Sequence, residues 1–143
     1  MTAGRAVRWE RLCMLYGRIA LGAGFLSAVA SRFGIWKGKV GLDSFPGFME
    51  YTAEVNSFMP AVTIPFLAWA ATVGELSLGL ALILGVWRRH VAFGSAALLA
   101  LFGTAMAISL GIKSPLDYSV FSASAGALLL GLYERRATTT EGS

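Results

Sequence analysis

Two ionisable residues, Arg18 and Glu75, stand inside long apolar runs, and their types could do chemistry. A charge at the centre of a lipid bilayer costs about 3 kcal/mol on insertion scales, so an ionisable residue there indicates a functional site by default. A carboxylate can bind or release a proton, and an arginine can donate hydrogen bonds to a polar group of a ligand. The same two charges can instead form a purely structural ion pair, and the sequence favours neither interpretation over the other.

The positions of the two charges predict that they meet. Arg18 lies six residues after Leu12, where the first apolar run begins, and Glu75 lies twelve residues before Trp87, where the second run ends. At about 1.5 Å per helical residue, both charges lie between one edge and the middle of the membrane, and an arginine side chain can span much of the difference. We therefore predict a buried Arg18–Glu75 pair between the first two membrane helices.

Residues at helical spacing extend this candidate site. In the second run one face holds Trp69, Thr72, Glu75 and Gly79. In the first run one face holds Arg18, Gly22, Phe25, Val29 and Arg32. Trp69 and Thr72 are therefore candidates to line a pocket beside Glu75, whereas the small residues more simply indicate close helix packing.

A further polar group, Lys113, Asp117 and Tyr118, opens the last apolar segment. A carboxylate in the first turn meets the positive end of the helix dipole, and Lys113 can pair with it. Tyr118 can serve as an anchor at the headgroup level. Capping and anchoring are the simpler roles, and the three residues remain candidates for a site on the outer face.

Several classes of chemistry are excluded by what the sequence contains. The only cysteine is Cys13 and the only histidine is His90, so no intramolecular disulfide, Cys-x-x-Cys relay or Cys/His metal site can form. The basic residues flank apolar runs and form no stripe, which is typical of membrane flanks and not of nucleic-acid binding. We expect no metal, no nucleic-acid partner and no intrinsic cofactor.

Composition and segment length predict an integral membrane protein. Hydrophobic residues make up 56% of the 143 residues and charged residues 14%, against roughly 25% charged in a soluble domain. About 20 apolar residues cross the hydrocarbon core as a helix. The sequence therefore predicts one all-α domain over 1–143, an integral membrane four-helix bundle with helices at about 12–31, 61–87, 91–112 and 115–133.

The long connection over 31–60 predicts a short interfacial segment between the first two membrane helices. It carries aromatic residues among glycines and charges, and Pro46 is placed to begin a helix. An amphipathic helix over Phe48–Phe58 is expected, acting either as an interfacial anchor or as a functional lid. The threonine-rich tail, Ala137–Ser143, is expected to be disordered.

The distribution of Lys and Arg predicts the orientation in the membrane. Four crossings place both termini on the side that carries Arg5, Arg8, Arg11, Arg88, Arg89, Arg135 and Arg136. The opposite side carries Arg32, Lys37, Lys39 and Lys113. Because cytoplasmic loops carry the excess of Lys and Arg, both termini are predicted to be cytoplasmic.

Short motifs in three of the apolar runs resemble the DoxX family of small bacterial membrane proteins. The matching stretches are Arg18-Ile19-Ala20-Leu21-Gly22, then Glu75-Leu76-Ser77-Leu78-Gly79-Leu80 running to Leu84-Gly85 with Arg88 or Arg89, and Ala105-Met106-Ala107. The resemblance extends over about Arg18 to Leu132. It implies a four-helix bundle in the bacterial cytoplasmic (inner) membrane, near redox chemistry, because some members are associated with thiosulfate:quinone oxidoreductase and others with complexes that handle oxidative stress.

Three functions are open at this stage. The first is a quinone-proximal accessory or anchor subunit of a redox complex, in which Arg18 and Glu75 orient a quinone oxygen or relay a proton. The second is a structural or assembly protein without a ligand. The third is a small proton-coupled transporter using Glu75, which a paired arginine disfavours because it holds the carboxylate ionised. The lipid bilayer is the expected partner for each of the three functions. The first function also requires a redox partner protein, and the sequence is compatible with an oligomer.

Overall fold

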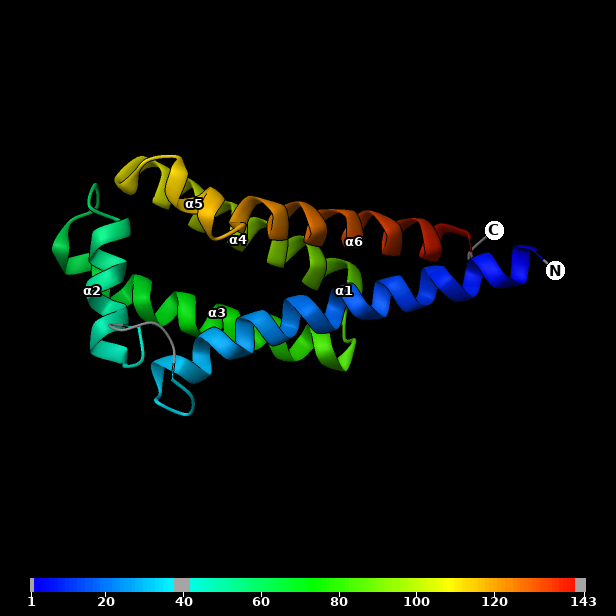
Figure 1. Cartoon of the computed structure of the whole chain (residues 1–143), viewed down its shortest axis with the longest axis horizontal. Coiled ribbons are helices and arrows are strands. Elements are labelled where there is room, and N and C mark those ends of the chain that lie inside the picture. The colour runs from blue at the N-terminus through cyan, green and yellow to red at the C-terminus, as the bar shows by residue number, and fades with distance from the viewer. Residues whose placement is uncertain (1, 38–41, 141–143) are drawn as a thin grey trace.

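The computed structural model describes residues 2–37 and 42–140, and every regular element in that part of the chain is helical (Figure 1). The helices in chain order are α1 (Thr2–Arg32), α2 (Phe45–Val55), the 3₁₀ turn η1 (Ala61–Thr63), α3 (Ile64–Leu84), α4 (Arg88–Leu110), α5 (Lys113–Asp117) and α6 (Val120–Thr140). Three segments are long and apolar enough to cross a membrane, namely Gly4–Arg32, Ala61–Leu84 and Arg88–Leu110. The chain is therefore an all-α, multi-pass membrane protein.

The last apolar segment differs from the single helix predicted over 115–133. It is divided into α5 and α6, because Ser119 adopts a left-handed backbone conformation with φ of 55° that a continuous helix cannot contain. Helix α6 then continues through Thr140, where the sequence predicts a disordered tail from Ala137; residues 141–143 lie outside the described part. Of the four predicted spans, α6 is the one that does not qualify by its own length and composition among the described helices.

Two helix pairs build the bundle, and glycines set the distance within each pair. In the α1–α3 pair, a Cβ added to Gly22 would lie 2.9 Å from the carbonyl oxygen of Gly79 and 2.8 Å from Ile83 Cγ1. In the α4–α6 pair, a Cβ on Gly103 would lie 2.7 Å from the ring of Phe121. Only glycine permits these approaches, which is how small residues bring helices together in lipid.

The Gly22 contact gives a test of the α1–α3 packing. Gly22→Ala is expected to destabilise the protein by about 1–3 kcal/mol, because the new methyl group meets backbone that must move. Gly24→Ala on the same helix is the matched control, because nothing lies within 4 Å of its added Cβ. Thermal unfolding in detergent compares the two variants, and equal melting temperatures would contradict the packing described.

The helix pairs are packed tightly at one end and diverge at the other. The core cluster of Phe25, Leu82, Val91, Ala92 and Leu130 joins all four long helices. Beyond it, Tyr133 Oη donates a hydrogen bond of 3.1 Å to Glu10 Oε2, so the beginning of α1 and the end of α6 lie together. Toward α2, α1 and α6 move apart (Figure 1).

Helix α2 lies across the divergent end of the bundle. Ser44 caps it by accepting a hydrogen bond from the amide of Gly47, and Pro46 occupies the first turn, where no amide hydrogen is needed. The predicted amphipathic helix is therefore present, but it begins at Phe45 and ends at Val55 instead of running over 48–58. Its buried face consists of Phe48, Thr52 and Val55.

Candidate functional site

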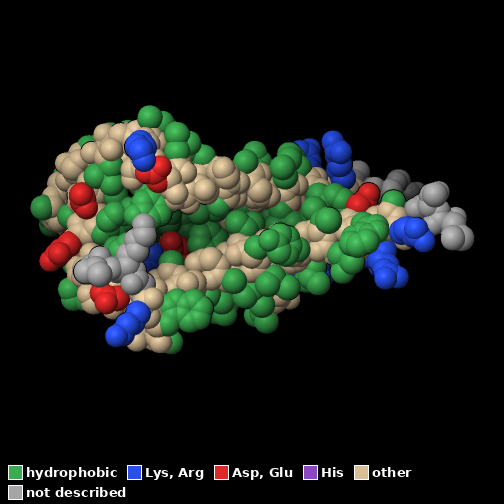
Figure 2. Space-filling model, in the orientation of Figure 1, with side chains coloured by type: hydrophobic (Ala, Val, Ile, Leu, Met, Phe, Trp, Pro, Cys, Tyr) green, Lys and Arg blue, Asp and Glu red, His purple; other side chains and the backbone are tan. Residues whose placement is uncertain are grey.

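A cavity of about 660 Å³ lies beneath α2, where the helix pairs diverge. Its walls come mainly from α3 and α4, and most of its lining is hydrophobic, including Leu67, Leu98, Leu99 and Phe102. Figure 2 shows a hollow lined largely by hydrophobic side chains between α1 and the α5–α6 side. A cavity of this size and character can hold a small apolar molecule or the head of a larger one.

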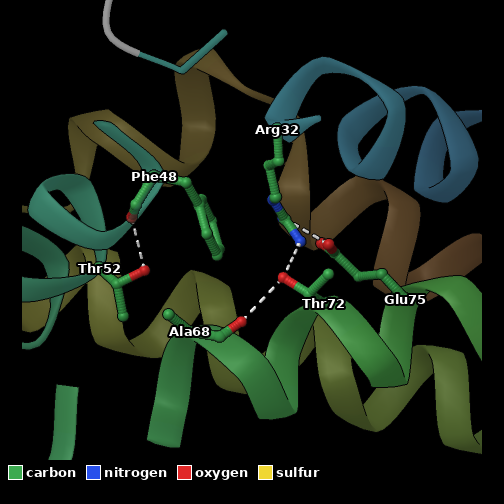
Figure 3. Close-up of polar contacts among 6 residues, drawn as sticks. All are labelled: Arg32, Phe48, Thr52, Ala68, Thr72 and Glu75. Carbon is green, nitrogen blue, oxygen red and sulfur yellow. Dashed lines mark hydrogen bonds and ion pairs between the residues drawn. The ribbon is translucent and has the colours of Figure 1, made fainter. Parts of the chain in front are cut away.

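One wall of the cavity is polar, because Arg32 and Glu75 line it, and Thr72 holds Arg32 by a hydrogen bond from outside the lining (Figure 3). The guanidinium of Arg32 forms an ion pair with Glu75 through Nη2 and Oε2, and Nη1 donates a hydrogen bond of 3.0 Å to Thr72 Oγ1. The Thr72 hydroxyl in turn donates to the carbonyl oxygen of Ala68 at 2.8 Å. Arg32 and Glu75 are 6% and 5% exposed, so both charges are removed from the surroundings of the protein.

The roof of the cavity holds Arg32 from above. The ring of Phe48 in α2 lies over the guanidinium, with Arg32 Cζ 3.5 Å from the ring centroid, which is a cation–π contact (Figure 3). Tyr51 of α2 also lines the cavity. Burial, followed by the nearby Tyr118 and Glu54, raises the pKa of Tyr51 above its ordinary value.

Arg32, and not Arg18, is the cation that Glu75 contacts, so the predicted pairing is wrong. The close approach of Gly22 and Gly79 fixes the antiparallel register of α1 and α3, and it sets Glu75 level with the stretch around Leu26. At about 1.5 Å per residue, Arg32 is then about 9 Å from that level along the helix and Arg18 about 12 Å. Arg32 also lies next to Thr72, which extends its contact with α3.

Arg18 instead contacts the end of α3. Its Nε donates a hydrogen bond of 3.0 Å to the carbonyl oxygen of Leu82, and Nη2 lies 3.5 Å from that of Ile83. The last carbonyl groups of a helix lack partners within the helix, and a cation there complements the negative end of the dipole. The role supported by these contacts is a cap on α3, where the chain turns at Gly85 with φ of 73°.

The other sequence candidates are divided between the site and the surface. Thr72 supports the polar wall through its hydrogen bond with Arg32. Trp69 is half exposed and packs against Phe45 of α2, with ring centroids 4.4 Å apart, so it helps to hold the roof. Lys113 and Asp117 form the expected pair at 2.5 Å on the exposed α5, and Tyr118 beside them is 49% exposed.

Sequence reasoning missed the roles of Arg32 and Phe48. Arg32 was assigned to the outer flank, although it ends the same helical face that contains Arg18 and Gly22. The signal that could have found it is the pairing of Gly22 with Gly79, because that register brings the end of α1 toward Glu75. Phe48 carried no such signal, since its place depends on how α2 folds over the bundle.

Comparison with protein families matches residues 13–113 to DoxX. The chain belongs to the DoxX family. The match covers α1 from Cys13 onward and all of α2, α3 and α4, so every residue of the polar wall lies in the part shared with the family. No curated protein and no solved structure matches this DoxX chain.

The polar wall of this DoxX protein can serve as a hydrogen-bonding site for a ligand. An arginine carries five N–H donors, and within the described part of the chain Arg32 directs one from Nη1 to Thr72 and one from Nη2 to Glu75. Glu75 Oε2 is buried and contacts Arg32 in the ion pair, and a carboxylate oxygen can accept a further hydrogen bond. Both groups therefore retain capacity for a polar ligand atom at the edge of an apolar cavity.

Proposed function

We propose that this DoxX-family protein is a quinone-binding accessory subunit that anchors a redox complex in the membrane. The observation that carries the proposal is the buried Arg32–Glu75 wall of a largely apolar cavity, with Thr72 hydrogen-bonded to Arg32 behind it. Arg32 can donate to a quinone carbonyl oxygen, and Glu75 can accept from a quinol hydroxyl. The apolar walls suit the ring and the first part of its chain.

The charge balance of the wall favours a neutral ligand. One guanidinium and one carboxylate sum to zero, so a fatty acid or phospholipid headgroup would meet the carboxylate without a surplus cation. A quinone head is uncharged and presents acceptor oxygens, which match the remaining donors of Arg32. The redox partner would act in sulfur or oxidative-stress chemistry, as the DoxX resemblance implies.

Two other functions are weighed against this one. A structural or assembly protein without a ligand would also contain a buried ion pair, but it has no need for the cavity beside it. A proton-coupled transporter using Glu75 needs a hydrated path for protons to the carboxylate, whereas most of the lining of the cavity beside it is hydrophobic. Quinone binding uses both the pair and the cavity.

The proposal is tested by what the protein carries when purified. Extraction in a mild detergent, followed by mass spectrometry of the bound lipids, is expected to find quinone in near-stoichiometric amount. The control is an unrelated multi-pass protein purified from the same membranes in the same detergent. Equal quinone in both preparations would contradict a specific site.

We further propose four crossings with both termini in the cytoplasm of a bacterium. Helix α6 packs along α4 and returns to the end of the bundle where the chain began, as its contact with Glu10 requires (Figure 1). Together α5 and α6 can supply the fourth crossing, since their apolar part begins near Lys113 and ends before Glu134. Because Arg32 is buried against Glu75, it no longer counts among the basic residues of the outer surface. The excess of Lys and Arg on the side of the two termini is therefore larger than the sequence count suggests.

A reporter fused after Ser143 tests this topology. We expect activity from a reporter that functions only in the cytoplasm and none from one that functions only in the periplasm, because Arg135 and Arg136 follow the positive-inside rule. A second fusion inserted after Ile112 should give the opposite pair of results. Periplasmic activity at Ser143 would contradict the orientation and the four crossings together.

A further inference from the structure

The cavity reaches the surface of the bundle between α3 and α4. Its lining includes Ala70 on α3 and Leu101, Thr104 and Ile108 on α4, all of which are exposed. Leu101 and Ile108 are 67% and 63% exposed, whereas Arg32 and Glu75 in the same lining are almost fully buried. The cavity therefore runs from a buried polar wall to an exposed apolar rim.

The rim lies at a depth where the surroundings are hydrocarbon. Ala70 is six residues from the start of α3 at Ile64, about 9 Å along the helix. Leu101 is nine residues before the end of α4 at Leu110, about 14 Å along it. Since the hydrocarbon core is about 30 Å thick, both positions face lipid acyl chains and not water.

The roof of the cavity is attached at both ends. At its start, Phe45 packs between Trp69 of α3 and Phe33, with ring centroids 4.4 Å and 6.0 Å away. At its end, Ser109 Oγ of α4 donates a hydrogen bond of 2.8 Å to the carbonyl oxygen of Val55. In the middle, Phe48 covers Arg32. Opening the roof would break all three contacts, whereas the rim between α3 and α4 requires none of them to break.

We propose that the cavity is loaded sideways from the bilayer, through a portal framed by Ala70, Leu101, Thr104 and Ile108, while α2 stays in place. The occupant of the portal is the apolar chain of the ligand, whose neutral head reaches the Arg32–Glu75 wall. The ligand class is thus a lipid-borne molecule with one slender chain that remains in the membrane. This inference rests on the proposed ligand site, but the route can be tested without a quinone.

The test uses a small apolar aryl diazirine dissolved in liposomes, which labels side chains that lipid-soluble molecules reach. Labelling of the cavity residues Leu98 and Phe102 is read by peptide mass spectrometry. Two changes are compared in a Cys13→Ser background. Leu101→Trp narrows the portal. Ser57→Cys with Ser109→Cys joins the turn directly after α2 to α4 and so ties down that end of the roof, because the two hydroxyl oxygens are 3.1 Å apart.

The portal predicts that the locked protein is labelled in the cavity as strongly as the parent and that Leu101→Trp loses most of this labelling. Ala70→Phe on the opposite rim should repeat the loss, and Leu129→Trp on the exposed face of α6 is the matched control with no loss. Loss of labelling in the locked protein, restored by reductant, would show entry under the roof and overturn the inference. The inference would also be overturned if the cavity residues of the parent were not labelled, or if neither Leu101→Trp nor Ala70→Phe reduced their labelling.

The outcome is separable from that of the proposed function. If the diazirine labels the cavity through the portal but the purified protein carries no quinone, the entry route is supported and the quinone assignment is rejected. A protein that carries quinone but is labelled only when α2 is free would do the reverse.

Discussion

Arg32→Leu is expected to destabilise the folded protein by about 3–5 kcal/mol, because it leaves the buried carboxylate of Glu75 without its cation. The variant also loses the hydrogen bond to Thr72 and the cation–π contact with Phe48. Glu75→Gln should cost less, since a neutral amide is cheaper to bury than an unpaired charge. Reversible unfolding in mixed micelles measures both changes in the free energy of unfolding.

A double-mutant cycle decides whether the Arg32–Glu75 ion pair accounts for this loss of stability. The variant Arg32→Leu with Glu75→Gln should recover much of the loss, giving a coupling energy well above experimental error. The matched cycle of Arg18→Leu with Glu75→Gln should be additive, because Arg18 contacts α3 carbonyl oxygens and not Glu75. Coupling in the Arg18 cycle and additivity in the Arg32 cycle would contradict the ion pair described here.

The second large effect is on quinone affinity. In lipid nanodiscs, the double variant Arg32→Leu with Glu75→Leu is expected to stay folded but to bind a short-chain quinone about 10–100-fold more weakly than the parent. The estimate follows from losing one hydrogen bond from a charged donor, which is worth about 1.5–3 kcal/mol. A purely structural pair predicts unchanged affinity once stability is restored.

The control for this binding experiment is the single variant Arg18→Gln. Arg18 is an intramembrane arginine that lies outside the cavity lining and caps α3. Its replacement should lower stability while leaving quinone affinity within twofold of the parent. Equal loss of affinity in both variants would mean that general loosening of the bundle, and not the polar wall, weakens binding.

Segment composition was sufficient to predict the membrane class, the three long spans and the short helix between the first two of them, which covers the bundle. Apolar length and the proline near the start of α2 are local properties, and local properties are visible in one sequence. The break at Ser119 was not visible, since a serine has no strong preference for the left-handed conformation that it adopts there.

The partner of Glu75 depended on a relation between helices that composition does not contain. Counting residues from the ends of apolar runs favoured Arg18, because it assumed that the start of the first run and the end of the second lie at the same membrane surface. The Gly22–Gly79 contact sets the true register, and α1 extends from Thr2 to Arg32, well beyond the predicted start at Leu12. Thr72 was found from its spacing to Glu75, since both stand on one helix and need no register between helices.

The most direct test of the central claim is the infrared carbonyl spectrum of a quinone labelled with ¹³C at one carbonyl and bound to the protein. A hydrogen bond from the Arg32 guanidinium weakens the C=O bond, so the account predicts a carbonyl band at lower frequency than in quinone dispersed in the same lipid. In Arg32→Leu with Glu75→Leu, loaded at saturating quinone, the band should return to the position of the free molecule. A bound quinone whose carbonyl bands match those of the free molecule in the parent, or shift equally in both proteins, would contradict the assignment of Arg32 and Glu75 as the quinone site.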